Sequence, residues 1–353
     1  MATTFNFTVR AEDDQGAFAD RDFSMTVRNT MVDRYMVVDA TDAYTSPDMV
    51  TWTKRAGQGG NAVSYGGGKW LITPIVNASS YRLSVDGVNF ASYPLAVPGY
   101  TGAYTAHPPV WNIDRWWVTM VAQATGVYHN LSMYSLDGIN WTLIAKSPAA
   151  SVILGSSMPS FADGKVFYAA NNSAKHYWFD ASATDVVNMS ETAPNLPAHT
   201  GVGSSITYSP PIKINDLWII LALGTSGMMS LYSTDRVVWG AGPLLPQANF
   251  ANRKLDSISY HNGKLIGSGY HSTTNSLAGH TVLSVDGKTW TSSNTAGATG
   301  TGNLRQYVVS TKGKIYVTSG LTKYSSSDIG VTWTLEPESF PTGVNTTGFA
   351  TIQ

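Results

Sequence analysis

Short apolar runs, rich in β-branched and aromatic residues, recur along the whole chain and are separated by Gly, Pro, Ser and Asn clusters. None continues at the 3.6-residue period of a helix, so the pattern predicts strands throughout. Several runs are paired around a Gly-Lys turn, at Gly68, Gly164, Gly263 and Gly313, where a residue with positive φ suits a tight β-turn. We therefore expect an all-β protein built from antiparallel hairpins.

A second pattern, Ser-x-Asp followed by an aromatic residue, repeats along the chain. It occurs in six segments: 45–52, 83–90, 134–141, 232–239, 283–290 and 325–333. With a weaker copy at Asp185, the Asp positions are 48, 86, 137, 185, 235, 286 and 328. The regular spacing of these Asp positions along the chain is typical of propellers with one four-stranded sheet per repeat. Each repeat reads as strand A, tight turn, strand B, loop, strand C, Asp turn and strand D.

The two ends of the repeat region complement each other. Residues 34–40 read as a strand B with no strand A before them, and residues 346–353 read as a strand A with nothing after them. We expect the C-terminal strand to complete the first sheet, which removes an exposed edge and brings Ile352 beside Arg34. The alternative is that residues 25–30 supply strand A. The expected fold is a seven-bladed β-propeller of four-stranded antiparallel blades, closed by the C-terminal strand.

The segment Ser-x-Asp-Gly-x-x-Trp resembles the Asp-box (BNR) repeat of sialidase-type β-propellers, over about residues 34–353. A short acceptor side chain at the C–D turn can take several backbone N–H bonds, and the aromatic residue can pack between neighbouring sheets. The resemblance implies that these turns lie opposite the substrate face. We expect structural roles for Asp48, Asp86, Asp137, Asp235, Asp286, Asp328, Trp52, Trp141, Trp239, Trp290 and Trp333.

Composition restricts the chemistry. Of the 353 residues only 13% are charged, the net charge is −1 and there is no Cys, which excludes disulfides, thiolate zinc sites and thiol nucleophiles and argues against nucleic-acid binding. Beyond the N-terminal region Glu occurs only at Glu191, Glu336 and Glu338, and most Asp residues lie in expected turns. Paired carboxylates for glycoside hydrolysis are therefore scarce. The seven His show no metal-ligand spacing. We expect no enzymatic activity, no cofactor and no metal.

The B–C and D–A loops form the face opposite the Asp turns. The longer loops are rich in Gly, Ser, Thr and Asn, which suit binding through adaptable hydrogen bonds, and aromatic residues there could serve as sugar platforms. Ordinary loop packing is the alternative for each residue. The candidate ligand-binding residues are Tyr100, Tyr104, His107, His199, Phe250, Arg253, Tyr270, His271 and His280.

Residues 4–28 alternate apolar and polar side chains about a DDQGA turn. They resemble the last two strands of bacterial and phage Ig-like or cadherin-like modules. A lone hairpin is only marginally stable in water. We therefore expect residues 1–30 to be a docking or oligomerisation segment and residues 31–353 to be the propeller.

The low charge, the absence of Cys and of a visible signal peptide, and the N-terminal hairpin together suit a bacteriophage virion. We expect a non-enzymatic structural protein of the tail, fibre or capsid surface, whose loops bind a host receptor or glycan. Residues 1–30 and the A–B turn face would contact other virion proteins, in a homo-oligomer with no nucleic acid and no membrane insertion. The alternatives are a glycan-degrading propeller hydrolase and a purely architectural decoration protein.

Overall fold

The computed structural model describes residues 2–351 except for gaps at 13, 29–34, 74–79, 96, 98–99, 107–108, 113, 125–126, 148–158, 170–175, 193–206, 210, 225–226, 247–252, 262, 272–279, 295–307, 312–313, 320–321, 329–330 and 337–347. These residues contain strands and turns and no helix, as the apolar pattern predicted. The strands form eight sheets: a two-stranded hairpin and seven larger sheets, here numbered 1 to 7 in chain order.

The strands of the first four larger sheets lie between residues 35 and 192, except for the C-terminal strand, which belongs to sheet 1. Sheet 1 contains β34 (Gly348–Thr351), β3 (Tyr35–Val38), β4 (Ala43–Ser46) and β5 (Thr53–Arg55). Sheet 2 contains β6 (Ala62–Gly66), β7 (Lys69–Thr73), β8 (Ser80–Ser84) and β9 (Ala91–Pro94). Sheet 3 contains β10 (Thr101–Ala106), β11 (Val110–Asn112), β12 (Arg115–Ala124), β13 (Val127–Ser135), β14 (Thr142–Lys146) and β18 (Val187–Asn188). Sheet 4 contains β15 (Ser160–Ala162), β16 (Lys165–Ala169), β17 (His176–Asp180) and β19 (Ser190–Thr192).

The remaining three sheets follow in the same manner. Sheet 5 contains β20 (Thr207–Tyr208), β21 (Ile212–Ile214), β22 (Leu217–Gly224), β23 (Gly227–Ser233), β24 (Gly240–Ala241) and β25 (Leu245–Pro246). Sheet 6 contains β26 (Arg253–His261), β27 (Lys264–His271), β28 (His280–Ser284) and β29 (Thr291–Asn294). Sheet 7 contains β30 (Val308–Thr311), β31 (Lys314–Ser319), β32 (Thr322–Ser326) and β33 (Thr334–Leu335).

The two six-stranded sheets keep the four-strand plan with interrupted outer strands. Strands β10 and β11 both pair with β12, and β20 and β21 both pair with β22, so each pair is one strand A in two pieces. Strands β24 and β25 likewise share β23. Strand β18 runs parallel to β14 and so connects sheets 3 and 4 by hydrogen bonds.

The C-terminal strand pairs with the first strand of the repeat region. Strand β34 lies antiparallel to β3, with Tyr35 opposite Thr351 and Val38 opposite Gly348. The alternative assignment of residues 25–30 is wrong, because β2 continues to Arg28 and pairs with β1. Arg34 and Ile352, the pair named in the prediction, lie outside the described residues.

Successive sheets pack face to face, and each interface contains one cluster of buried side chains. Successive strand residues point to opposite faces. Trp116 of β12 therefore packs toward sheet 2, whereas Trp117 packs toward sheet 4. In sheet 5, Ile220 faces sheet 4 and Ile219 faces sheet 6. Because both faces are covered, these strands B are continuously apolar, and their alternation is lost in the sequence.

The Gly-Lys turns have the predicted backbone. Gly68, Gly164 and Gly263 have φ values of 75°, 68° and 84°. Gly313 lies outside the described residues. Left-handed backbone of this kind is accessible to glycine without a Cβ penalty.

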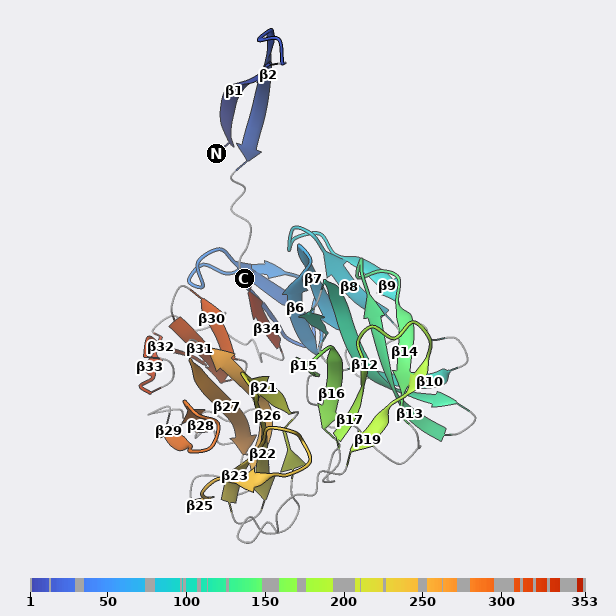
Figure 1. Cartoon of the computed structure of the whole chain (residues 1–353), viewed down its shortest axis with the longest axis vertical. Coiled ribbons are helices and arrows are strands. Elements are labelled where there is room, and N and C mark those ends of the chain that lie inside the picture. The colour runs from blue at the N-terminus through green and yellow to red at the C-terminus, as the bar shows by residue number, and fades with distance from the viewer. Residues whose placement is uncertain are drawn as a thin grey trace.

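The N-terminal hairpin consists of β1 (Ala2–Glu12) and β2 (Phe18–Arg28), and Figure 1 shows it standing apart from the larger sheets. On one face, the Arg10 side chain donates to Asp20 at 2.7 and 2.8 Å, and Thr8 donates to Asp22 at 2.6 Å. On the other face, Phe7 is 48% exposed. The hairpin therefore presents one polar and one apolar face.

Candidate functional site

Five Ser-x-Asp turns share one hydrogen-bond pattern, and in the sixth Asp328 accepts from Ser326 and from the Thr332 N–H, four residues further on. In sheet 6, the Ser284 hydroxyl accepts the Gly287 N–H at 2.8 Å, and Asp286 accepts the N–H groups of Lys288 and Thr289, both at 2.8 Å. Partial burial would raise the pKa of several of these carboxyl groups, but the N–H donors outweigh it and hold the pKa of all six below the usual value. Six carboxylates therefore serve to order turns.

The aromatic residue of the repeat braces the same turn. The indole Nε1 groups of Trp52, Trp239 and Trp290 donate to the carbonyl oxygens of Met49, Arg236 and Gly287, at 3.2, 3.0 and 3.2 Å. Trp333 is buried among sheets 6 and 7, and Trp141 packs against the cluster of sheets 2 and 3. In sheet 4 the turn differs, because Asp180 pairs with Lys165 at 2.5 Å and no Asp185 hydrogen bond is found among the described residues.

The residue after the turn Asp adopts a left-handed backbone and faces the preceding sheet. Glycine fills this position at Gly87, Gly138 and Gly287. A Cβ at Gly138 would lie 2.8 Å from Leu83 of sheet 2, and one at Gly287 would lie 2.1 Å from Ile219 of sheet 5. The position is therefore crowded where the neighbouring sheet fills the space with its own side chains.

Two turns have a side chain at this position: Met49 in sheet 1, with a φ of 68°, belongs to the buried cluster between sheets 7 and 1, and Arg236 in sheet 5 has a φ of 65°. Its guanidinium lies 4.9 Å from the ring centre of Trp218, 5.6 Å from that of Phe167 and 5.9 Å from that of Trp178. Within the described ranges no carboxylate lies in ion-pair range of this guanidinium. Aromatic faces thus hold the cation at the boundary between sheets 4 and 5.

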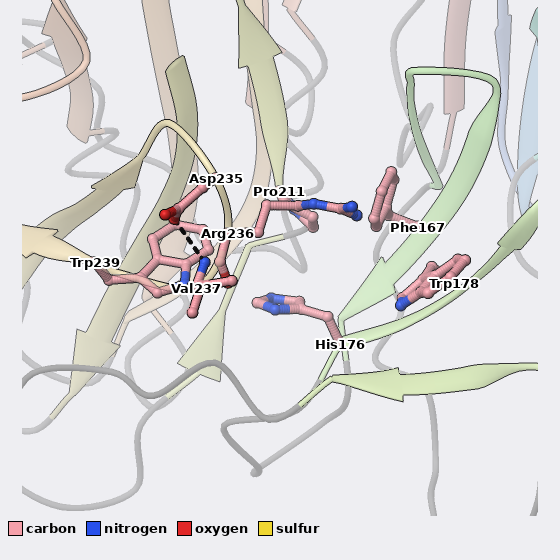
Figure 2. A pocket seen from close by; sticks show the side chains of 8 residues that line it. All are labelled: Phe167, His176, Trp178, Pro211, Asp235, Arg236, Val237 and Trp239. Atoms are coloured by element: carbon pink, nitrogen blue, oxygen red, sulfur yellow. Dashed lines mark hydrogen bonds between the residues drawn. The ribbon is translucent and has the colours of Figure 1, made fainter. Parts of the chain in front are cut away.

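A cavity of about 160 Å³ lies beside Arg236. Figure 2 shows the Arg236 side chain reaching across it toward Phe167, and the His176 ring directed from β17 toward the turn of sheet 5. The volume is close to the ~150 Å³ of an apolar cavity that accepts benzene, so the space suits one six-membered ring. The lining residues are Phe167, His176, Trp178, Pro211, Asp235, Arg236, Val237 and Trp239.

His176 contributes an unusual polar group to this cavity. Its side chain is 4% exposed, and its Nε2 atom has no hydrogen-bond partner among the described residues. Burial lowers the pKa of His176 to about 4, against a hydrogen bond to the Ser209 backbone that favours the protonated ring. The ring is therefore neutral at pH 7. Since Nδ1 is left to donate to the Ser209 carbonyl, Nε2 is an acceptor without a donor.

The cavity combines an acceptor, a cation and aromatic walls. Among the described residues Asp235 is the only acidic one that lines it, and its carboxylate accepts the N–H groups of Val237 and Val238 at 2.8 and 2.9 Å. The arrangement can bind a polar ring but offers no pair of carboxylates for acid and base catalysis. In the described part of the chain, no three His, Asp or Glu residues gather as metal ligands. No helix there is long and apolar enough to cross a membrane.

Among the candidate residues from the loop pattern, those that the structure describes do not line this cavity. Tyr100 is half-buried, and its ring lies 5.8 Å from that of His129. Arg253 and His271 are opposite each other in the β26–β27 ladder, and Tyr270 pairs with Lys254. Tyr104 belongs to β10, and His280 begins β28. His107, His199 and Phe250 lie outside the described residues.

Sequence reasoning missed His176, Trp178 and Arg236 as site residues. One signal could have identified the place: sheet 5 has Asp-Arg where three other repeats have Asp-Gly. A bulky charged residue in a glycine position marks a turn whose neighbourhood differs from the others.

No family model and no curated protein matches this sequence. Solved structures resemble its fold. A 6-phosphogluconolactonase candidate from Bacteroides fragilis is 8% identical, with a TM-score of 0.59, covering 93% of this chain and 100% of that chain. A protein from Lactobacillus plantarum is 11% identical, with a TM-score of 0.60, covering 91% of this chain and 99% of that chain. An arabinanase from Bacillus subtilis is 13% identical, with a TM-score of 0.34, covering 63% of this chain and 92% of that chain.

The first two similarities extend over nearly the whole of both chains. Together with the seven larger, mainly antiparallel sheets, they show that the chain has a β-propeller fold. At these identities they establish the fold and leave the activity to be argued from the site.

Proposed function

We propose that this chain is a non-enzymatic, ligand-binding β-propeller, and that the cavity between sheets 4 and 5 binds a small ring-shaped molecule. The observation that carries the proposal is Arg236. A left-handed backbone costs a non-glycine residue about 1–2 kcal/mol, and here that residue places a cation in an aromatic-walled cavity. Backbone strain of this kind gathers at binding sites, where the strained residue serves the ligand.

The proposal includes a closed ring of seven Asp-box blades. Seven buried clusters support it, one between each pair of consecutive sheets, including one in which Tyr316 of sheet 7 packs against Tyr35 and Tyr44 of sheet 1. The pairing of β34 with β3 supports it as well. A closed ring fixes the spacing between sheets, which keeps the cavity open in the absence of ligand.

The second candidate function is glycan or lactone hydrolysis. The names of the similar structures favour it, since they include a 6-phosphogluconolactonase candidate and an arabinanase, and they agree better with the hydrolase alternative than with a virion protein. The engagement of Asp235 by backbone N–H groups argues against it at this cavity. Release of reducing sugar from polysaccharides such as arabinan, abolished by Asp235→Asn, would establish hydrolysis in place of binding.

We keep the virion placement as a proposal, with residues 1–30 as the docking segment of a homo-oligomer. Its support is the hairpin, which stands apart from the larger sheets and exposes Phe7 and Val9. Exposed apolar residues on a marginal two-stranded sheet favour burial against a partner. Mass spectrometry of purified phage particles tests the placement, since recovery of the chain from disrupted cells alone contradicts it.

Small ring probes test the binding function. Phenol and cyclohexanol, soaked into crystals and titrated in solution, are expected to occupy the cavity and to change tryptophan fluorescence, because Trp178 and Trp239 line it. Trp178→Ala should abolish the response, whereas Trp52→Phe, in the turn of sheet 1, should leave it intact. Electron density for both probes only at other places would overturn the proposal.

A further inference from the structure

The unpartnered groups of the cavity specify the chemistry of its ligand. His176 presents Nε2 as an acceptor, buried and with no donor among the described residues. An unmade hydrogen bond at a buried polar atom is costly, so a ligand that donates to this atom gains the full benefit of satisfying it. The ligand therefore needs an N–H or O–H group at this end of the cavity.

Arg236 imposes the opposite requirement. Its guanidinium carries five N–H donors, and in the described residues its contacts are aromatic rings and no carboxylate. The adjacent Asp235 makes no ion pair with it among the described residues, and its Oδ1 atom accepts from Val237, Val238 and Ser233. The ligand therefore needs an acceptor oxygen at this end.

The walls between these two groups are apolar. Phe167, Trp178, Pro211 and Trp239 line the cavity, and the Trp239 N–H is already donated to the Arg236 carbonyl oxygen. Aromatic faces of this kind pack against the C–H face of a ring. The cavity volume of about 160 Å³ suits one ring of the ligand.

Resting on the proposed binding function, we infer that the cavity takes one neutral sugar residue, with a hydroxyl group donating to His176 Nε2, a second oxygen accepting from Arg236, and a C–H face on the tryptophan wall. A sugar carries groups that donate and accept, on a ring with an apolar face. A carboxylate only accepts at pH 7 and leaves Nε2 unsatisfied. A hydrocarbon ring leaves both polar groups unsatisfied.

Titration with methyl glycosides of glucose, galactose, mannose and arabinose tests the inference, with phenol and benzoate as comparison probes. Binding is followed by saturation-transfer NMR and by thermal shift. We expect at least one glycoside to bind with a Kd of about 1 mM, as suits a single ring. Comparison with the matching disaccharide distinguishes a free sugar from the end residue of a glycan.

The variants give the decisive contrast. Arg236→Gly restores the residue found in three equivalent turns and should weaken sugar binding at least about tenfold, as should His176→Phe. His129→Asn is the control, since His129 also has a ring nitrogen without a partner but lies outside the cavity. Phenol binding without any glycoside binding overturns the sugar inference and leaves the proposed function standing. If no probe binds, both the sugar inference and the proposed function are overturned. The sugar inference alone is overturned if benzoate binds more tightly than all the glycosides. It is also overturned if both variants bind the glycosides as the wild type does.

Discussion

The guanidinium carbon of Arg236 lies 4.9 Å from the ring centre of Trp218, in its own sheet 5, and 5.6 Å from that of Phe167, in the neighbouring sheet 4. A cation over aromatic faces gains about 0.5–2 kcal/mol, depending on its desolvation. One side chain therefore links the turn of sheet 5 to the buried strand β16 of sheet 4. The contact offsets the backbone strain of the turn and orients the guanidinium toward the cavity.

Replacing Arg236 with Gly should change the free energy of unfolding by no more than about 1 kcal/mol, because lost aromatic contacts are offset by relief of the left-handed backbone. Chemical denaturation of the variant measures this. A loss of several kcal/mol would show that Arg236 is chiefly a structural element.

The reverse change provides the control. Gly287→Arg should destabilise the protein by about 2–4 kcal/mol, because a Cβ there would lie 2.1 Å from Ile219 and the φ of 71° disfavours a side chain. Equal tolerance of the two substitutions would contradict the distinction between these turns.

Acid should destabilise the protein through His176. Burial lowers the pKa of this histidine from 6.5 to about 4, so the unfolded chain binds a proton that the folded chain does not between these values. Stability is fully present above about pH 6.5 and is lost as the pH falls to about 4, by up to ~3 kcal/mol. Denaturation curves of the wild type and His176→Phe across this range isolate the contribution, since the carboxylates titrate in both proteins. Parallel pH profiles would contradict it.

The serine of the repeated turn should contribute more to the stability of the protein than its small side chain suggests. Ser284→Ala removes a 4% exposed hydroxyl that accepts two backbone N–H groups and donates to Asp286. We expect a loss of about 1–3 kcal/mol, since buried N–H donors lose their partner. Thermal unfolding measures it, with exposed Thr291→Ala as control. Equal melting temperatures for the two variants would refute this role.

A disulfide between the ends of the propeller region should form and stabilise it. The chain has no Cys, so Val38→Cys with Gly348→Cys introduces a single possible pair at opposed positions of β3 and β34. Oxidation should raise the free energy of unfolding by about 2–4 kcal/mol relative to the reduced form of the same variant. Free thiols that persist under oxidant would contradict this pairing.

Deletion of residues 1–28 tests the hairpin as an association segment. The seven larger sheets contain their own buried clusters, so the truncated protein should keep its circular dichroism spectrum and melt cooperatively. Light scattering should show a lower oligomeric state than the full chain. Phe7→Ser with Val9→Ser removes the exposed apolar residues alone and should have the same effect. An oligomeric state equal to that of the full chain for both variants would exclude association through this hairpin.

None of the loop residues chosen from the sequence that the structure describes lines the cavity. They were selected as aromatic and basic residues in polar loops, a criterion that treats each loop separately. The cavity instead lies between two sheets, and its residues come from strand β17, the segment before β21 and the Asp turn of sheet 5. His176 and Arg236 are 60 positions apart and share no motif. Only the packing of sheet 5 on sheet 4 brings both side chains to the same cavity.

Local sequence determined the elements of this protein, namely its strands, the glycine turns at Gly68, Gly164 and Gly263, and the Ser-x-Asp turns, because each depends on residues within one hairpin. The pairing of β34 with β3 could also be inferred, since an incomplete first repeat and an unpaired last strand leave one economical match. The binding cavity was decided only by the tertiary structure. Packing between sheets 4 and 5 buries His176 and leaves its Nε2 atom without a partner among the described residues, and the guanidinium of Arg236 reaches Phe167 and Trp178 only because sheet 4 packs against its turn.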